Sequence, residues 1–261
     1  MNFLEVESAL AENEFEAVGR ITTASNGALL LDSKDEKNAI RAIFKPKIGI
    51  RQLWDFPNDD LIERELASYL LSKASGANLI PPTIVREIAP YGEGTVQYWI
   101  EAARIEAVKI FSPTAIESGF TEVLQANDAS GELVSVATLD SDWLSFLVLF
   151  DAVINNADRK GSHILTDEKK RMWAIDHGVT WHREDKLRTI LWANAAEKLN
   201  DAQIDFLSSL ANALESEFET FEKLLSPEEV TSAFLRLEKI KETGSFPVPS
   251  QKWPAIPWPI F

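Results

Sequence analysis

The sequence of 261 residues contains no cysteine. Without cysteine there can be no disulfide framework, no thiolate metal site and no cysteine nucleophile. This absence fits a reducing compartment, and we expect a cytoplasmic protein. The N-terminal segment, residues 1–7, is acidic and lacks the basic residues that begin a secretory signal peptide, so we expect no signal peptide here.

Basic residues and long apolar runs are also scarce. The chain has 26 Lys and Arg against 41 Asp and Glu, which gives a formal net charge of −15. Nucleic-acid binders and proteins that dock on anionic lipids depend on clustered Lys and Arg, so we expect neither a nucleic-acid partner nor stable membrane insertion. The longest apolar run, residues 143–154, is too short for a bilayer-spanning helix, which needs about 20 residues. It predicts a buried helix instead.

The first hundred residues predict a small antiparallel sheet. Strand-forming residues occupy 18–23, 28–31, 39–44, 83–88 and 95–100, with turn residues between them. One helix, with apolar residues at helical spacing from Leu61 and an end near Gly76, lies among these strands. We therefore expect an N-terminal lobe over residues 1–100 that contains five strands and one helix.

Residues 101–261 predict a second, mostly helical lobe. Helices are expected over 142–154, 201–225 and 227–241, with a short hairpin at 164–165 and 172–175, whereas 110–139 shows no clear pattern. The tail over 246–261 has too much proline to be helical, and its tryptophans indicate that it packs on the body. The whole chain predicts one α+β domain with two lobes and a cleft between them, which is the kinase-like architecture.

The most informative segment, residues 155–182, contains two aspartates and all three histidines of the chain. Asp158 follows a long apolar run, and Asp176 follows a short strand-like run eighteen positions later. This layout is typical of a phosphotransfer site, where one carboxylate accepts the proton of an attacking hydroxyl and the other holds the metal that neutralises the phosphates. Either aspartate alone could be only a helix-cap or turn residue.

A lysine and a glutamate precede these aspartates in the order that such a site requires. Lys45 ends the third expected strand, and Glu65 lies twenty residues later in the first helix. In a kinase-like fold a lysine at this place grips the α- and β-phosphates of ATP, and a helix carboxylate orients it. Each would be an ordinary surface residue if it stood alone. The four residues together favour the functional interpretation.

A turn between the first two strands, Ser25, Asn26 and Gly27, is a weaker candidate for nucleotide binding. Backbone N–H groups in such a turn can cradle a phosphate, although most turns of this kind have no ligand.

His163 lies five residues after Asp158, where phosphotransferases of this type usually have a metal-binding asparagine. Because imidazole suits softer cations than Mg²⁺, His163 predicts a preference for Mn²⁺, the binding of one metal instead of two, or only a structural hydrogen bond. If it is a ligand, metal binding should weaken as the pH falls through about 6.5. The spacing of His163, His177 and His182 matches no common zinc motif, and the last two are expected to be structural or to line the substrate side.

Several motifs together resemble an actinobacterial family labelled phosphatidylinositol 3-/4-kinase-like, which is related to the HipA-type atypical kinases. These motifs are Phe44-Lys45-Pro46, residues 53–57, Arg64-Glu65, Val96-Gln97, residues 155–160, Asp176-His177-Gly178 and residues 186–189. The resemblance spans most of residues 15–240 and implies a two-lobed atypical kinase fold.

The resemblance also implies a role for each site residue. Lys45 would contact phosphate, Glu65 would pair with it, Asp158 would be catalytic and Asp176 would hold the metal. The hinge would comprise Gln97, Trp99 and Glu101, with adenine bound beneath it. The implied cofactors are ATP and either Mg²⁺ or Mn²⁺. Two residues depart from the pattern of lipid kinases: His163 stands in place of asparagine, and Lys160 stands in place of the histidine of Asp-Arg-His. These departures weaken the phosphatidylinositol label of the family more than they weaken the expected fold.

From these observations we expect an ATP-dependent phosphotransferase whose acceptor is a hydroxyl of a protein or a small metabolite. Phosphoinositide is a weaker candidate because the chain is acidic and has no membrane element. Two alternatives stay open: transfer of AMP to a protein hydroxyl, and a catalytically idle nucleotide-binding or interaction module. The segment 182–192 is expected to face the substrate.

Overall fold

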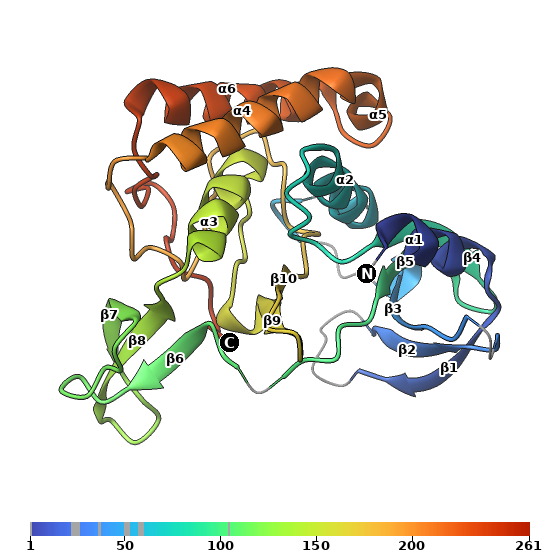
Figure 1. Cartoon of the computed structure of the whole chain (residues 1–261), viewed down its shortest axis with the longest axis horizontal. Helices are drawn as coiled ribbons and strands as arrows, with labels where there is room; N and C mark the ends of the chain where they lie inside the picture. Colours follow the sequence, from blue (N-terminus) through green and yellow to red (C-terminus); the bar gives the residue numbers. More distant parts are fainter. Residues whose placement is uncertain (1, 22–26, 36–37, 50–52, 57–59, 104) are drawn as a thin grey trace.

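Alternating apolar and polar residues build an antiparallel sheet of five strands in the first part of the chain, on the right of Figure 1. The computed structural model describes residues 2–21, 27–35, 38–49, 53–56, 60–103 and 105–261. The strands, in the spatial order β1-β2-β3-β5-β4, are β1 (Phe15–Arg20), β2 (Leu29–Ser33), β3 (Arg41–Pro46), β5 (Gly92–Tyr98) and β4 (Thr83–Ile88). Lys45 therefore lies on the central strand, one residue before the end of β3.

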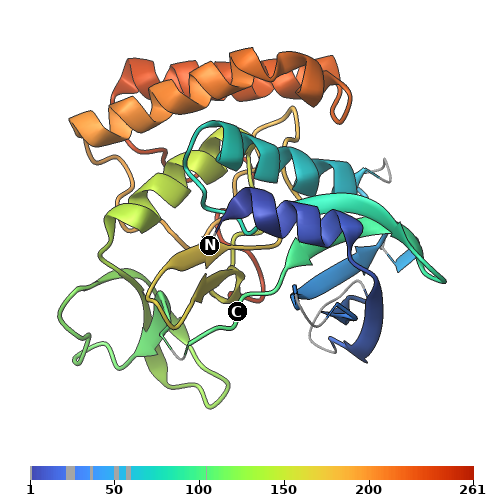
Figure 2. The same cartoon turned by 45° about the vertical axis from the view of Figure 1, so that its right-hand side comes forward.

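Two helices accompany this sheet, where the sequence predicted one. The additional helix, α1 (Phe3–Glu12), places Leu10 in the apolar core of the sheet. The expected helix, α2 (Leu61–Ala74), lies beside α1 in Figure 2, and Tyr69 and Lys73 of α2 both bind the carboxylate of Glu7 on α1. The short 3₁₀ helix η1 (Lys47–Gly49) follows β3.

The second part of the chain is mainly helical. Its elements are α3 (Asp142–Ile154), the 3₁₀ helix η2 (Gly161–His163), β9 (Ile164–Thr166), β10 (Met172–Ala174), α4 (Asp201–Ser216), α5 (Phe218–Glu222) and α6 (Pro227–Thr243). Helix α3 is apolar on nearly every side, so it is buried in the centre of this lobe. Helices α4 and α6 lie together along the top of Figure 1.

Two further parts of the fold differ from the expectation. The segment without a clear pattern forms a three-stranded sheet in the order β6-β8-β7, with β6 (Val108–Phe111), β7 (Phe120–Asn127) and β8 (Leu133–Leu139). A bulge in β7 between Glu122 and Leu124 interrupts its alternation, which hid the strand in the sequence. The helix expected over 201–225 breaks at Glu217, and this break directs Phe221 into the core against Trp181.

The expected α+β fold, with a small antiparallel sheet in the first part of the chain and a helical second part, is confirmed. The proline-rich tail packs on the body, since the backbone N–H of Thr189 donates to the carbonyl of Ala255 and that of Gly161 to the carbonyl of Ile260. Within the described ranges, no helix has the length and apolar character needed to cross a membrane.

The close approach of β5 to β3 predicts that Gly94 cannot be replaced. A Cβ atom on Gly94 would lie 2.3 Å from the carbonyl oxygen of Lys45 and 2.6 Å from the ring of Phe44. Because the backbone of β3 itself must move, Gly94→Ala should lower the free energy of unfolding by about 1–3 kcal/mol in urea denaturation. Gly19→Ala is the control, since nothing lies within 4 Å of its Cβ position. Equal stability of the two variants would contradict the packing described here.

Candidate active site

The Lys45 ammonium group lies between two carboxylates from different lobes. Its Nζ is 2.7 Å from Oε1 of Glu65 on α2 and 2.9 Å from Oδ1 of Asp176, which follows β10. Burial acts to lower the pKa of Lys45, but the charges of Asp176 and Glu65 outweigh it and raise that pKa. The lysine is therefore positively charged at every physiological pH.

The two carboxylates beside Lys45 differ in their surroundings. Burial raises the pKa of Glu65 in spite of the neighbouring lysine, whereas the charge of Lys45 holds the pKa of Asp176 far below its usual range. Glu65 has only 4% of its side chain exposed, but Asp176 has 47% exposed. Glu65 is thus placed to orient the lysine, and Asp176 keeps oxygen atoms accessible to a further ligand.

Asp158 lies in the loop after α3, close to a second lysine. Its backbone N–H donates to Oδ1 of Asn156 at 3.0 Å, and its carboxylate is 3.0 Å from Nζ of Lys160. Burial raises the pKa of Asp158, and Lys160 acts against this shift. A carboxylate of raised pKa is better suited than an ordinary one to accept a proton at neutral pH.

A buried arginine ties the Asp158 loop to the Asp176 loop. Arg159 makes two hydrogen bonds to Asp151 of α3, at 2.7 and 3.0 Å, and both side chains are almost fully buried. The same guanidinium group donates to the carbonyl of Ile175 at 2.9 Å and contacts Nε2 of His177 at 2.7 Å. Since arginine can only donate, His177 accepts through Nε2, so His177 is a structural residue of this network.

His163 lies beside Asp176, with its Nε2 3.4 Å from Oδ2 of the aspartate. Burial lowers the pKa of His163 to about 4, so its imidazole is neutral at neutral pH and could ligate a cation. The pH dependence expected near 6.5 from the sequence therefore moves to about pH 4. Its Nδ1 is buried and has no hydrogen-bond partner among the described residues.

The donors here fit a metal that arrives with a nucleotide better than a free metal ion. In the part of the chain that the structure describes, no group of three or more Asp, Glu, Cys or His side chains could hold a metal. Mg²⁺ needs no such cage, because it usually binds one or two carboxylates together with phosphates and water. Asp176 and the neutral His163 can supply that smaller set.

The residues expected to hold the rest of the nucleotide are less clearly positioned. Ser25 and Asn26 lie outside the described residues, and Gly27 is described just before β2. Gln97 is buried and donates from Nε2 to Thr83 Oγ1 at 2.8 Å, while Trp99 Nε1 donates to Glu101 at 3.1 Å. Trp99 and Glu101 lie on the segment that leaves β5 for the second lobe. The nucleotide roles of these residues stay predictions.

Four residues around Asp158 had no role assigned from the sequence, namely Asp151, Asn155, Asn156 and Arg159, although the last three lie in the motif of residues 155–160. Asn155 ends α3 in a left-handed conformation, donates to the carbonyl of His182 at 2.8 Å and accepts from the N–H of Lys186 at 2.9 Å. A signal was present for the two asparagines, since asparagine directly after an apolar helix favours a helix end with side-chain hydrogen bonds.

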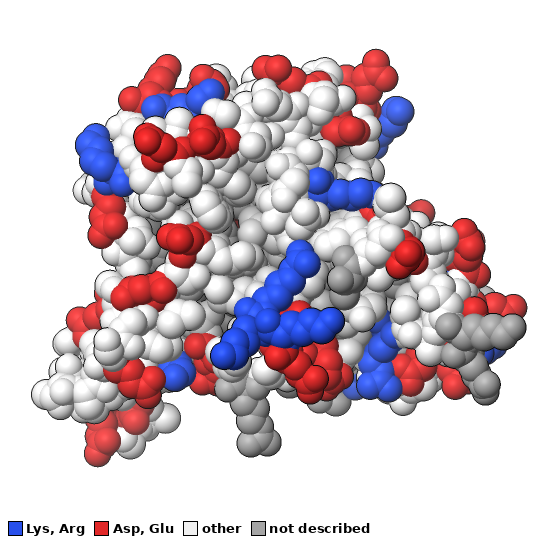
Figure 3. All heavy atoms as spheres, in the orientation of Figure 1, with Lys and Arg blue, Asp and Glu red and all other residues white. Residues whose placement is uncertain are grey.

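Figure 3 shows where the net charge of −15 resides. Acidic side chains are scattered over the whole face in view, whereas basic side chains gather mainly near its middle, over the region of β9 and β10. Negative charge is thus spread over most of this face, and basic side chains interrupt it near the middle.

Comparisons with known proteins found a relative in sequence and similarities among solved structures. No protein-family model matches the chain. Protein Rv2133c of Mycobacterium tuberculosis is 34% identical over 265 residues, which cover 97% of this chain and 95% of that protein. The crystal structure of the Helicobacter pylori proinflammatory kinase CtkA superposes with a TM-score of 0.46 and 8% identity over 90% of this chain and 93% of that chain.

The Arg159 network predicts a large loss of stability when its carboxylate is neutralised. Asp151→Asn would leave the Arg159 charge buried without its partner, which should lower the free energy of unfolding by about 3–5 kcal/mol in urea denaturation. Glu238→Gln is a matched control, because it removes a carboxylate from the exposed pair with Lys241 and should cost at most about 1 kcal/mol. A similar, small loss in both variants would mean that the network does not stabilise the two loops.

Proposed function

The chain belongs to the family of protein Rv2133c of Mycobacterium tuberculosis, and for this chain we propose an ATP-dependent phosphotransferase that acts on a hydroxyl group of a protein or a small metabolite. The observation that carries the proposal is the ammonium group of Lys45, held between Glu65 and Asp176 at 2.7 and 2.9 Å. A lysine on a strand, oriented by a helix glutamate, is the phosphate contact of protein kinases. Asp176 supplies a second carboxylate beside this lysine, where protein kinases have a metal-binding carboxylate.

The catalytic roles follow from the surroundings of each group. Lys45 would contact the phosphates of ATP, and Asp176 with His163 would hold Mg²⁺ or Mn²⁺, which supplies neutralisation of phosphate charge when bound. Asp158 would accept the proton of the acceptor hydroxyl as its oxygen bonds to the γ-phosphorus. Lys160, 3.0 Å from Asp158, is placed to stabilise negative charge on the transferred group.

The finer parts of this proposal rest on the sequence. They are the phosphatidylinositol 3-/4-kinase-like label, the cytoplasmic location, the nucleotide contacts of Gly27, Gln97, Trp99 and Glu101, and the absence of a nucleic-acid partner. The acidic surface supports the last of these, because nucleic-acid binding draws on clustered positive charge.

Removal of the proposed metal ligand should weaken nucleotide binding. Asp176→Ala takes away the charged oxygen that faces the metal and one of the two carboxylates beside Lys45. We expect the affinity for ATP with Mg²⁺ to fall at least about tenfold in calorimetry, which corresponds to the loss of one charge-assisted contact. Asp205→Ala, on the exposed face of α4, removes a carboxylate away from this site and should leave the affinity unchanged. Wild-type affinity in Asp176→Ala would exclude the assigned role.

Removal of the proposed base should separate turnover from binding. Asp158→Asn keeps the size of the side chain but cannot accept the proton, so turnover should fall about 10²–10⁴-fold while ATP affinity changes less than about twofold. Turnover is measured with an unbiased mass-spectrometric screen of metabolites and proteins, run with wild type and with Asp158→Asn. Products heavier by AMP instead of phosphate would favour nucleotidyl transfer, and undiminished turnover in Asp158→Asn would show that Asp158 is not the base.

A further inference from the structure

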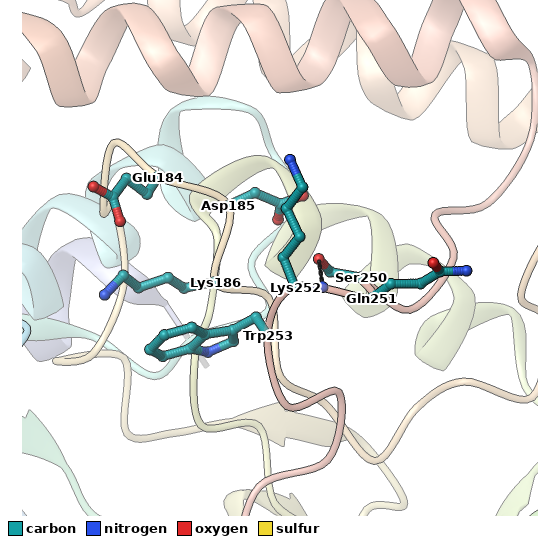
Figure 4. Close-up of a pocket in the computed structure, with 7 residues that line it drawn as sticks. All are labelled: Glu184, Asp185, Lys186, Ser250, Gln251, Lys252 and Trp253. Atoms are coloured by element: carbon teal, nitrogen blue, oxygen red, sulfur yellow. Dashed lines mark hydrogen bonds between the residues drawn. The ribbon is translucent and has the colours of Figure 1, made fainter.

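A cavity of about 560 Å³ lies where the C-terminal tail meets the segment expected to face the substrate. Figure 4 shows its lining, which comes from two parts of the chain far apart in sequence. We call it the tail cavity, and it is lined by Glu184, Asp185, Lys186, Ser250, Gln251, Lys252 and Trp253. Its volume is within the range of small-molecule sites, about 300–1,000 Å³.

One wall of the tail cavity is fixed by a lysine and an indole ring. The side chain of Lys186 lies across the ring of Trp253 in Figure 4, with Nζ 4.4 Å from the ring centre. The same ammonium group is 3.3 Å from Asp55, and only 5% of the side chain is exposed. The charge of Lys186 is therefore already neutralised by Asp55, and its side chain holds the Trp253 ring in place. Trp54 is 82% exposed and lies with its ring centre 6.1 Å from that of Trp253, at an angle of 40° between the rings, so it extends this wall toward solvent.

Trp253 lines the tail cavity and also contacts Arg188, which lies near the proposed base, Asp158. The guanidinium group of Arg188 lies 5.5 Å from its ring centre, and Arg188 Nε donates to the carbonyl of Ala157 at 2.7 Å. Arg188 is thereby held next to Asp158. Burial raises the pKa of Asp158, and the charge of Arg188 is among the effects that oppose this shift, as expected for two nearby groups of opposite charge.

Arg188 differs from Lys186 in having no carboxylate partner. Among the residues that the structure describes, no Asp or Glu oxygen lies within 4.0 Å of its guanidinium nitrogens, and the side chain is half-buried. A partly buried guanidinium group without a counter-ion is the arrangement that binds carboxylate or phosphate through two parallel hydrogen bonds. In a chain with a net charge of −15, such a fixed positive group favours an anionic ligand over a neutral one at this point.

The tail leaves little room for an extended peptide along the same segment. The N–H of Thr189 and the indole N–H of Trp192 both donate to the carbonyl of Ala255, each at 3.0 Å. A peptide that paired with this segment would need such main-chain groups to be unoccupied. We therefore expect a small acceptor instead of an extended peptide on this segment.

We propose that the acceptor is a small hydroxyl compound that bears a carboxylate or a phosphate, bound with its anionic group on Arg188, which lies against Trp253 of the tail cavity, and with its hydroxyl toward Asp158. This inference rests on the proposed phosphotransfer and names its substrate class. The acceptor oxygen forms a bond to the γ-phosphorus of ATP as the bond from that phosphorus to the bridging oxygen breaks. ADP leaves with the electron pair, and the hydroxyl proton goes to Asp158.

Neutral and anionic probes of related structure test the inference. Binding of glycerol, glycerol 3-phosphate, glucose, glucose 6-phosphate and gluconate would be measured by calorimetry on the full chain, in the presence and absence of ATP with Mg²⁺. The proteins are wild type, Arg188→Gln, the charge-conserving Arg188→Lys, and Lys241→Gln, which removes one positive charge from the exposed face of α6. Affinity for ATP with Mg²⁺ is measured separately in each.

We expect wild type to bind at least one anionic probe and none of the neutral ones with comparable affinity. Arg188→Gln should weaken that binding by about 10- to 100-fold, the effect of one charge-assisted hydrogen-bonded contact. Arg188→Lys should recover part of it, Lys241→Gln should have no effect, and the affinity for ATP should stay within about twofold in all four proteins.

Four results would overturn the inference: no binding of any anionic probe, equal binding of neutral and anionic probes, a loss in Arg188→Gln no greater than in Lys241→Gln, or a parallel loss of ATP affinity that would make Arg188 a purely structural residue. Failure of wild type to bind ATP would instead count against the proposed phosphotransfer. In that case the titrations of the same probes without ATP would still show whether the chain binds anions selectively.

Discussion

One ammonium group, on Lys45, connects three parts of the molecule that are distant in sequence. It joins strand β3 to helix α2 through Glu65 and to the loop after β10 through Asp176. Only 15% of the lysine side chain is exposed, so its charge depends on these two carboxylates for compensation. Because an uncompensated buried charge is strongly destabilising, the lysine fixes the distance between the sheet and the second lobe. The proposed phosphate and metal contacts both depend on that distance.

The position of Glu65 is set by ion pairs on both sides of α2. Arg64 pairs with Glu229 of α6 and donates to the carbonyl of Thr180 at 2.6 Å, which ties α2 to the helical lobe. On the other side Lys73 is 2.7 Å from Glu7 of α1. These ion pairs hold Glu65 against Lys45. Such preorganisation lowers the cost of arranging charged groups when a substrate binds.

From the sequence alone, candidate residues could be named, but not their contacts. Lys45, Glu65, Asp158 and Asp176 became candidates because each lies on, or shortly after, a strand or helix that the sequence pattern predicts, and the structure shows which of them meet. The Lys45–Asp176 ion pair spans 131 positions, and no local pattern predicts it. The sheet of β6, β7 and β8 was missed because β6 and β7 are largely exposed and β7 is bulged, so their apolar alternation is weak. Likewise, the lack of a carboxylate partner for Arg188 among the described residues is evident only once the tail is in place.

The central claim is that Lys45 and Glu65 act as one unit in binding ATP. A double-mutant cycle in calorimetry tests it most directly, with the affinity for ATP and Mg²⁺ measured in wild type, Lys45→Met, Glu65→Gln and the double variant. If the glutamate acts only through the lysine, each single variant loses at least about tenfold in affinity, and the double variant loses no more than the weaker-binding single one. Losses that add in the double variant, or wild-type affinity in Lys45→Met, would contradict the account.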